Sequence, residues 1–349
     1  MSGNETNCRC LQVTEKNKKL DISMASRLSV APMMEWTDRH CRLFHRQFSS
    51  HALLYTEMVT ARALTHGDPE RLIGKSEAEG HVALQLGGSE PEVLAKAVKI
   101  AEPFGYSEIN LNCGCPSDRV QSGAFGACLM RDPGLVADCV SAMKDAAQSS
   151  EITVKCRIGV DEQEPREILP DFLSRVSASG VDHFIIHARK AWLQGLSPKE
   201  NRDIPPLDHA LVVEMKGLFP ALEIVVNGGI MSLEEALPHL DAGLDGVMIG
   251  RAAYHDPCAV LADADARVFG MDSPRTDPSD AVRAMYPHIE AELTRGTRLN
   301  QITRHMLGAF TGQPGARAWR RVLSEGAHLP AAGPDLIEQA LSHVERRAA

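Results

Sequence analysis

The chain has 349 residues, of which 44% are hydrophobic and 24% charged, a composition that excludes a fibre and wholesale disorder. No stretch approaches the ~18 consecutive apolar residues of a membrane helix, so we expect no membrane partner. The formal net charge of -9 argues, taken alone, mildly against a nucleic-acid partner.

Residues 1–27 are predicted to form a polar N-terminal extension. Charged side chains occur throughout it, and it has no apolar segment typical of a secretory signal. The nine cysteines are too few for a disulfide scaffold, so we expect reduced thiols in a cytoplasmic protein. The pairs Cys8/Cys10 and Cys113/Cys115 do not recur at zinc-site spacing, so we expect no metal.

Eight short apolar runs alternate with amphipathic segments. The runs are rich in β-branched residues and almost continuously apolar, as is typical of strands buried on both faces. Eight strand-then-helix units predict an α/β fold, a TIM (β/α)8 barrel, with a doubly wound sheet as the alternative. The predicted strands are 28–33, 53–58, 81–87, 107–113, 152–158, 183–188, 223–228 and 246–250. The clearest predicted helices are 91–102, 133–147 and 232–242, the last with Ser232 as its N-cap.

The chain after the barrel is predicted to be a small all-helical C-terminal domain. A Pro-, Asp- and Ser-rich linker at 270–280 divides the barrel, 28–270, from this domain, 271–349. The predicted helices are 281–294, 297–309, 316–324 and 334–346.

Basic residues gather in two parts of this acidic chain. Residues 293–324 contain six arginines and no acid, and Arg189, Lys190, Lys199 and Arg202 form a second cluster with one acid, Glu200. Such local basic stretches can bind a polyanion, although a single surface charge is more often simply solvated.

Glycines follow the last two predicted strands. Asn227-Gly228-Gly229 ends the seventh strand and Gly250-Arg251 ends the eighth. In barrels, the loops after these strands commonly bind phosphate through backbone amides. The sequence therefore predicts a phosphate site, with ordinary turn glycines as the alternative.

Polar residues also lie within or at the ends of other strands. Lys155 lies inside the fifth strand, where a buried cation needs an anionic partner. It could be a Schiff-base lysine or a cofactor ligand. Gln85 and His187 end the third and sixth strands on the same predicted rim.

Cys115 begins a long polar loop after the fourth strand, and such a loop is more often functional than a simple connector. This cysteine could be a nucleophile, which needs a nearby base, or a proton donor, which remains a thiol near neutral pH. The sequence does not decide between these roles.

Together, these motifs resemble the tRNA-dihydrouridine synthases. The resemblance covers about residues 28–325, and the segments 187–207 and 304–317 are similar to the A subfamily. Cys113 is a departure, because the family more often has an aliphatic residue or methionine there. The matching motifs are Ala31-Pro32-Met33, Leu111-Asn112-Cys113-Gly114-Cys115-Pro116, Lys155-Cys156-Arg157, His187-Ala188-Arg189 and Asn227-Gly228-Gly229-Ile230.

The resemblance implies an FMN-binding barrel followed by a helical tRNA-binding domain. Lys155 would stabilise the anionic reduced flavin. The implied flavin contacts are Pro32, Met33, Met34, Gln85, Lys155, His187, Asn227, Gly228, Gly229, Gly250 and Arg251.

The resemblance also implies a reaction. NADPH reduces FMN, hydride passes to C6 of a D-loop uridine (U20 and U20a in the A subfamily), and Cys115 protonates C5 as general acid. The implied tRNA contacts are Asn112, Lys199, Arg202, Arg298 and Arg304. The alternative is an FMN-dependent small-molecule oxidoreductase of the dihydropyrimidine or dihydroorotate dehydrogenase type. Such an enzyme would share the barrel but would leave the arginine-rich helices unexplained.

Overall fold

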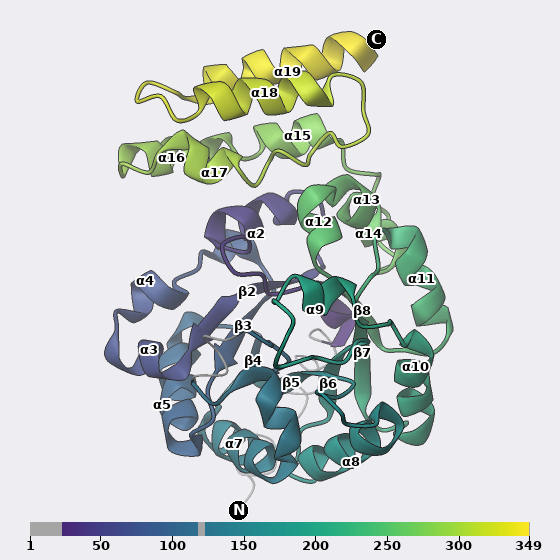
Figure 1. Ribbon diagram of the computed structural model, residues 1–349. Helices are drawn as coiled ribbons and strands as arrows, with labels where there is room; N and C mark the ends of the chain where they lie inside the picture. Colours follow the sequence, from purple (N-terminus) through teal and green to yellow (C-terminus); the bar gives the residue numbers. More distant parts are fainter. Residues whose placement is uncertain (1–22, 118–122, 349) are drawn as a thin grey trace, which may run out of the picture.

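The computed structural model describes residues 23–117 and 123–348. Eight parallel strands close into a barrel in sequence order, with β8 paired to β1, which confirms the predicted TIM barrel (Figure 1). The strands are β1 Leu28–Val30, β2 Leu53–Thr60, β3 Val82–Gly87, β4 Glu108–Cys113, β5 Glu151–Arg157, β6 His183–His187, β7 Glu223–Asn227 and β8 Gly246–Ile249. Strand β1 ends three residues earlier than predicted, and the other seven agree with prediction within two residues at each end.

The predicted N-terminal extension is only partly described, because residues 1–22 lie outside the described residues. Residues 23–26 are helical, and Ala25 and Ser26 are buried. A Cβ at Gly246 would lie 2.2 Å from the Ser26 carbonyl oxygen, so this segment packs closely against the start of β8. The last residues of the predicted extension are therefore part of the packed structure.

Helices surround the barrel, and side chains cap many of their N-termini. Ser232 accepts a hydrogen bond from the Glu235 amide, which confirms the predicted N-cap. The helices around the barrel are α2 Arg39–Arg46, α3 Ala61–His66, α4 Pro69–Ile73, α5 Pro91–Ala101, α7 Pro133–Ala146, α8 Pro165–Ser177, α9 Glu200–Asp203, α10 His209–Leu218, α11 Leu233–Asp241, α12 Arg251–His255, α13 Pro257–Leu261 and α14 Ala264–Arg267.

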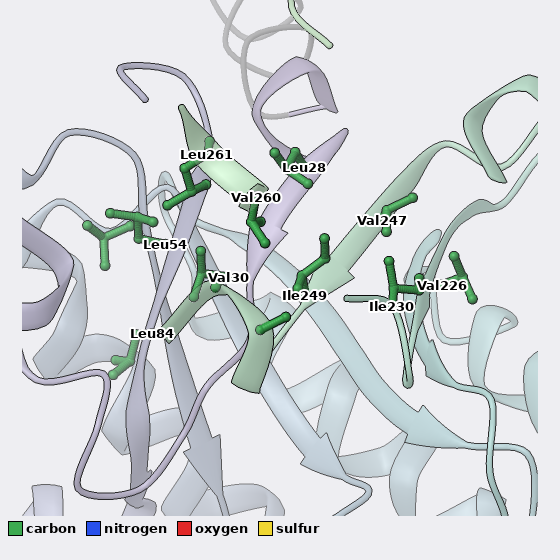
Figure 2. Packing of buried hydrophobic residues seen from close by; sticks show 14 of the residues in the cluster. Leu28, Val30, Leu54, Leu84, Val226, Ile230, Val247, Ile249, Val260 and Leu261 are labelled. Carbon is green, nitrogen blue, oxygen red and sulfur yellow. The ribbon is translucent and has the colours of Figure 1, made fainter. Parts of the chain in front are cut away.

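The apolar core has two parts. A small cluster that includes Leu53, Ile185 and Met248 draws most of its residues from the strands, with Ala25 before β1 and Ala31 after it. A much larger cluster joins the strands to the helices. Figure 2 shows part of the larger cluster, in which Val260 and Leu261 of α13 join side chains of β1 and β8. No helix of the described residues is long and apolar enough to cross a membrane.

The C-terminal segment is helical, as predicted, but its described part forms five helices where four were predicted. The predicted helix 281–294 is two helices, because Pro287 lacks an amide hydrogen and favours the first turn of a new helix. The predicted helix 297–309 ends at Thr303 and continues as turns. The helices are α15 Pro278–Arg283, α16 Tyr286–Thr294, α17 Leu299–Thr303, α18 Ala316–Gly326 and α19 Pro334–Ala348.

These helices pack on the barrel beside α2, α12 and α13 (Figure 1). The Cys258 thiol donates a hydrogen bond to the Ala309 carbonyl at 3.1 Å. Asp38, before α2, forms an ion pair with Arg304 at 2.6 Å. Met306 and Phe310 belong to the same buried apolar cluster as the barrel strands, so the hydrophobic core runs from the barrel into the helical segment.

Candidate functional site

The carboxyl ends of the strands bring several predicted site residues together. In the barrel register Asn112 lies opposite Lys155, and His187 lies opposite Asn227. These four residues therefore occupy the same rim of the barrel on strands β4 to β7. This is the face on which TIM barrels carry their active sites.

Lys155 is held toward the seventh strand. Its Nζ donates a hydrogen bond to Asn227 Oδ1 at 2.9 Å, and Asn227 Nδ2 donates to the Met248 carbonyl at 2.8 Å. Burial lowers the pKa of Lys155 to about 7, although part of the residue reaches solvent. No carboxylate of residues 23–117 or 123–348 forms an ion pair with Lys155, so an anionic ligand would supply the counter-charge that its ammonium form lacks.

His187 lies against the glycine turn after β7. A Cβ at Gly228 would lie 3.1 Å from His187 Cε1, and Gly228 has a φ of +113°, so a side chain there would be both crowded and strained. His187 Nδ1 is buried without a hydrogen-bond partner in the described structure. Burial, together with the cations Arg157 and Lys155, lowers the pKa of His187 well below its ordinary value. The imidazole is therefore neutral, with one ring nitrogen left for a ligand.

The loops after β8 and β1 lie beside each other. A Cβ at Gly250 would lie 3.6 Å from Met33 Sδ, and the Met33 amide donates a hydrogen bond to Thr37 Oγ1 at 3.0 Å. Met34 is 57% exposed, and Pro32 is partly exposed.

Arg251 has a protein partner that the sequence did not reveal. Its Nη2 lies 2.8 Å from Asp203 Oδ1 in α9, so the loop after β6 is joined to the start of α12. A bound phosphate would share this guanidinium with the Asp203 carboxylate or displace it.

The start of the Cys115 loop is fixed through its backbone. The Gly114 and Cys115 amides donate to Asn112 Oδ1 at 3.1 and 2.9 Å, and the Ala127 amide donates to the Cys115 carbonyl at 2.9 Å. The Cys115 thiol is partly exposed and lies 3.6 Å from Ser117 Oγ. Residues 118–122 of the predicted functional loop lie outside the described residues.

Asn112 and Gln85, predicted to contact tRNA and flavin respectively, contact each other. Asn112 Nδ2 donates to Gln85 Oε1 at 2.8 Å, and Gln85 Nε2 donates to Asn110 Oδ1 at 2.8 Å. Asn112 is 7% exposed and Gln85 only 1%. Each amide thus has an internal partner at both ends and keeps one hydrogen for any ligand.

Arg157 belongs to one of the motifs that carry the family resemblance, but no role in the site was predicted for it. Its guanidinium donates to the carbonyls of Gly114 at 2.9 Å, Lys190 at 2.9 Å and Asn201 at 3.0 Å. Burial lowers its pKa to about 10, and no carboxylate of the described residues forms an ion pair with it. It ties the Cys115 loop to the loop after β6. An arginine in a buried strand, one residue beyond Cys156, was the available signal.

The predicted tRNA contacts lie in different surroundings. Lys199 and Arg202 lie at α9 and are exposed, as is Arg298 beside α17. Arg304 is engaged by Asp38 and keeps a side-chain exposure of 47%. Further exposed arginines lie on α18, whose Trp319 and Leu323 face the core; they are Arg317, Arg320 and Arg321.

A TIM barrel that gathers a lysine, a neutral histidine and a cysteine at the carboxyl ends of its strands has the arrangement in which enzymes of this fold carry their active sites. The family model for dihydrouridine synthase (Dus) matches residues 29–345, and the chain belongs to this family. The chain is 56% identical over 345 residues to the tRNA-dihydrouridine(20/20a) synthase of Escherichia coli K12, covering 99% of both chains.

A second curated relative is about as similar in sequence as the first, whereas a solved structure matches at low sequence identity. The tRNA-dihydrouridine(20/20a) synthase of Xanthomonas campestris pv. campestris is 55% identical over 322 residues, covering 92% of this chain and 95% of the relative. Among solved structures, the old yellow enzyme homologue from Zymomonas mobilis has a TM-score of 0.48 and 14% identity, covering 72% of this chain and 90% of that one.

Proposed function

We propose that this protein is a flavin-dependent tRNA-dihydrouridine synthase that reduces uridines 20 and 20a in the D-loop, with FMN as cofactor and NADPH as electron donor. The observation that carries the proposal is the cluster of Lys155, His187 and the Gly228 turn beside the Cys115 loop. Membership of the dihydrouridine synthase family supports it, as do the names of the relatives.

The rim residues fit a flavin. Lys155 would face the part of the ring that becomes anionic on reduction, and His187 Nδ1 would supply a neutral hydrogen-bonding group. The phosphate would lie at the Gly228-Gly229 and Gly250-Arg251 turns, with Pro32, Met33, Met34, Gln85 and Asn227 as the remaining contacts. When bound, the flavin supplies hydride chemistry that protein side chains lack.

Cys115 would act as the general acid. Its thiol would donate a proton to C5 of the uracil while C6 is reduced, and Asn112 would use its remaining amide hydrogen at the uracil edge. Both amide ends of Asn112 already hold internal partners, so this side chain would present the uracil with a fixed orientation. The target uridine must leave its stack to reach the rim.

The RNA would be held by the exposed cations. Lys199 and Arg202 lie beside the site, and Arg298 and the α18 arginines present charge from the helical segment. A small-molecule oxidoreductase would leave these arginines without a role, and the family match favours the RNA substrate. We expect an Arg298/Arg317/Arg320 triple alanine variant to flatten the log–log salt dependence of tRNA binding by about 0.7–0.9 for each phosphate that the protein no longer neutralises.

The reaction is tested with unmodified tRNA, purified protein and NADPH, measuring dihydrouridine by mass spectrometry. We expect product with the wild type and a strong loss in Cys115→Ala. The matched control is Cys128→Ala, which removes another partly exposed thiol close to the same loop, bonded to the Phe125 carbonyl. Equal activity of the two variants would remove Cys115 as the acid. No product from flavin-loaded wild type would refute the synthase.

The positions and the electron donor are tested separately. A tRNA transcript with cytidine at positions 20 and 20a should yield no dihydrouridine, and continued formation would show that other uridines are the targets. Flavin reduction by NADPH and NADH, followed by absorbance, ranks the two donors.

A further inference from the structure

A chain of hydrogen bonds crosses the barrel interior from the Cys115 loop to Glu108. Each group in this chain donates its hydrogen bond to the next group in the direction of Glu108. The Cys115 amide donates to Asn112, Asn112 to Gln85, Gln85 to Asn110, Asn110 to Thr153 and Thr153 to Glu108, over distances of 2.9, 2.8, 2.8, 2.7 and 2.5 Å. Tyr55 also donates to the same Glu108 oxygen at 2.5 Å. All these side chains are 7% exposed or less.

The two ends of the chain set its direction independently. The backbone amide of Cys115 can only donate, so Asn112 must present its oxygen there and its nitrogen to Gln85. At the other end Glu108 Oε1 accepts from both the Tyr55 and the Thr153 hydroxyls, so Thr153 donates to it and is left to accept from Asn110. Both requirements give the same orientation to all three carboxamides. Reversing one of them alone would face oxygen to oxygen or nitrogen to nitrogen in a buried site.

We propose that Thr153 and Asn110 are positioning residues for the Cys115 loop. They act through Gln85 to hold the Asn112 carboxamide with its oxygen toward the Gly114 and Cys115 amides. Neither residue reaches the rim, and both lie fully buried below it. The consequence for catalysis rests on the proposed function, whereas the consequence for the loop does not.

The Thr153 hydroxyl is the group of this chain that a substitution can remove with the least change in side-chain shape. Thr153→Val keeps the volume and the β-branched shape but removes the hydroxyl that Asn110 and Glu108 share. Thr153→Ser keeps the hydroxyl and serves as the matched control. Without the hydroxyl the Asn110 amide loses its acceptor, and the carboxamides are free to take either orientation.

The first readout is the rate at which iodoacetamide alkylates Cys115, followed by mass spectrometry of its peptide. It requires neither tRNA nor turnover. A loosened loop exposes its thiol more often, so we expect alkylation about threefold faster or more in Thr153→Val. Thr153→Ser should react at the wild-type rate. Equal rates in the valine and serine variants would overturn the proposal.

The second readout separates positioning from substrate binding. Thr153→Val should slow single-turnover dihydrouridine formation about tenfold, since a displacement below 1 Å already costs rate, while the Kd for tRNA stays within about twofold. Thr153→Ser should restore the rate, and a valine variant as fast as the serine variant would refute positioning. If the valine variant does not fold, Thr153→Ala removes the same hydroxyl with less bulk. A wild type that makes no dihydrouridine refutes the proposed function alone, since alkylation still reports on the loop.

Discussion

Replacing Asp38 with alanine should weaken the attachment of the C-terminal helices to the barrel. One carboxylate oxygen of Asp38 accepts from Arg304 Nη2 at 2.6 Å and lies 2.9 Å from His305 Nε2. The other caps α2 by accepting from the His40 and Cys41 amides. Burial alone would raise the pKa of Asp38, but His305, the Cys41 amide and Arg304 outweigh it and hold the pKa well below its ordinary value.

The expected loss of stability has two parts. Loss of an N-cap costs about 0.5–2 kcal/mol. Hydrogen bonds to a charged group contribute about 1.5–3 kcal/mol, and the lower end applies because Arg304 keeps 47% side-chain exposure. We therefore expect Asp38→Ala to lower the free energy of unfolding by about 2–4 kcal/mol.

Asp68→Ala is the matched control. Asp68 caps α4 through the Glu70 and Arg71 amides but forms no ion pair among the described residues. Urea unfolding followed by circular dichroism should show a loss of about 1 kcal/mol for this variant. An equal loss in the two variants would refute the contribution assigned to Arg304 and His305.

The Asp38 contribution also has a defined pH dependence. The folded-state pKa lies below the ordinary value of 3.8, so the contribution is complete well above 3.8 and is lost as the pH falls toward the folded pKa. The difference between wild type and Asp38→Ala should stay constant near neutral pH and shrink below about pH 4. A difference that persists in acid would contradict the ionic origin.

Three further results are expected. Arg157→Lys should lower kcat about tenfold with an unchanged Kd for tRNA, because one ammonium cannot replace a guanidinium that bonds three carbonyls; an unchanged kcat would contradict this. Gly308→Ala should cost about 1–3 kcal/mol in urea unfolding, because its Cβ would lie 2.6 Å from the His255 carbonyl oxygen, whereas Gly217→Ala, with open space around it, should be neutral or stabilising. Burial lowers the pKa of His183, but surrounding glutamates outweigh it and raise the pKa to about 9. The stability lost in His183→Gln should therefore shrink between pH 6.5 and 9, and a constant loss would exclude a charged histidine.

The barrel was predictable because strands buried on both faces leave a continuous apolar run in the sequence. The helix boundaries of the C-terminal segment were less predictable than the barrel strands. The amphipathic pattern of the sequence continues from α15 into α16, Tyr286–Thr294. Only Pro287 indicates that a second helix begins there. The turns after Thr303 keep a helix-like pattern in the sequence. A Cβ at Gly308 would clash with the α12 backbone, which the sequence does not reveal.

The sequence predicted those site residues that lie at the carboxyl ends of the strands. Lys155, His187 and Asn227 end or nearly end their strands, and the closed barrel brings them together. The partners of Arg251 and Arg304 were not predictable, because Asp203 and Asp38 lie 48 and 266 residues away in the chain. Periodicity and local motifs predict a helix or strand and which of its faces is buried. They do not predict which distant loop supplies the carboxylate that pairs with an arginine.

The contacts around Cys115 bear on the choice that the sequence left open. Asn112 and Arg157 both hold the loop through its backbone, and neither bonds the thiol. Among the described residues, Sγ forms a hydrogen bond with the Ser117 hydroxyl and none with a histidine or a carboxylate. A nucleophilic cysteine needs such a base, whereas a proton donor needs a fixed position and a retained proton. The described contacts therefore support the proposed role of Cys115 as proton donor.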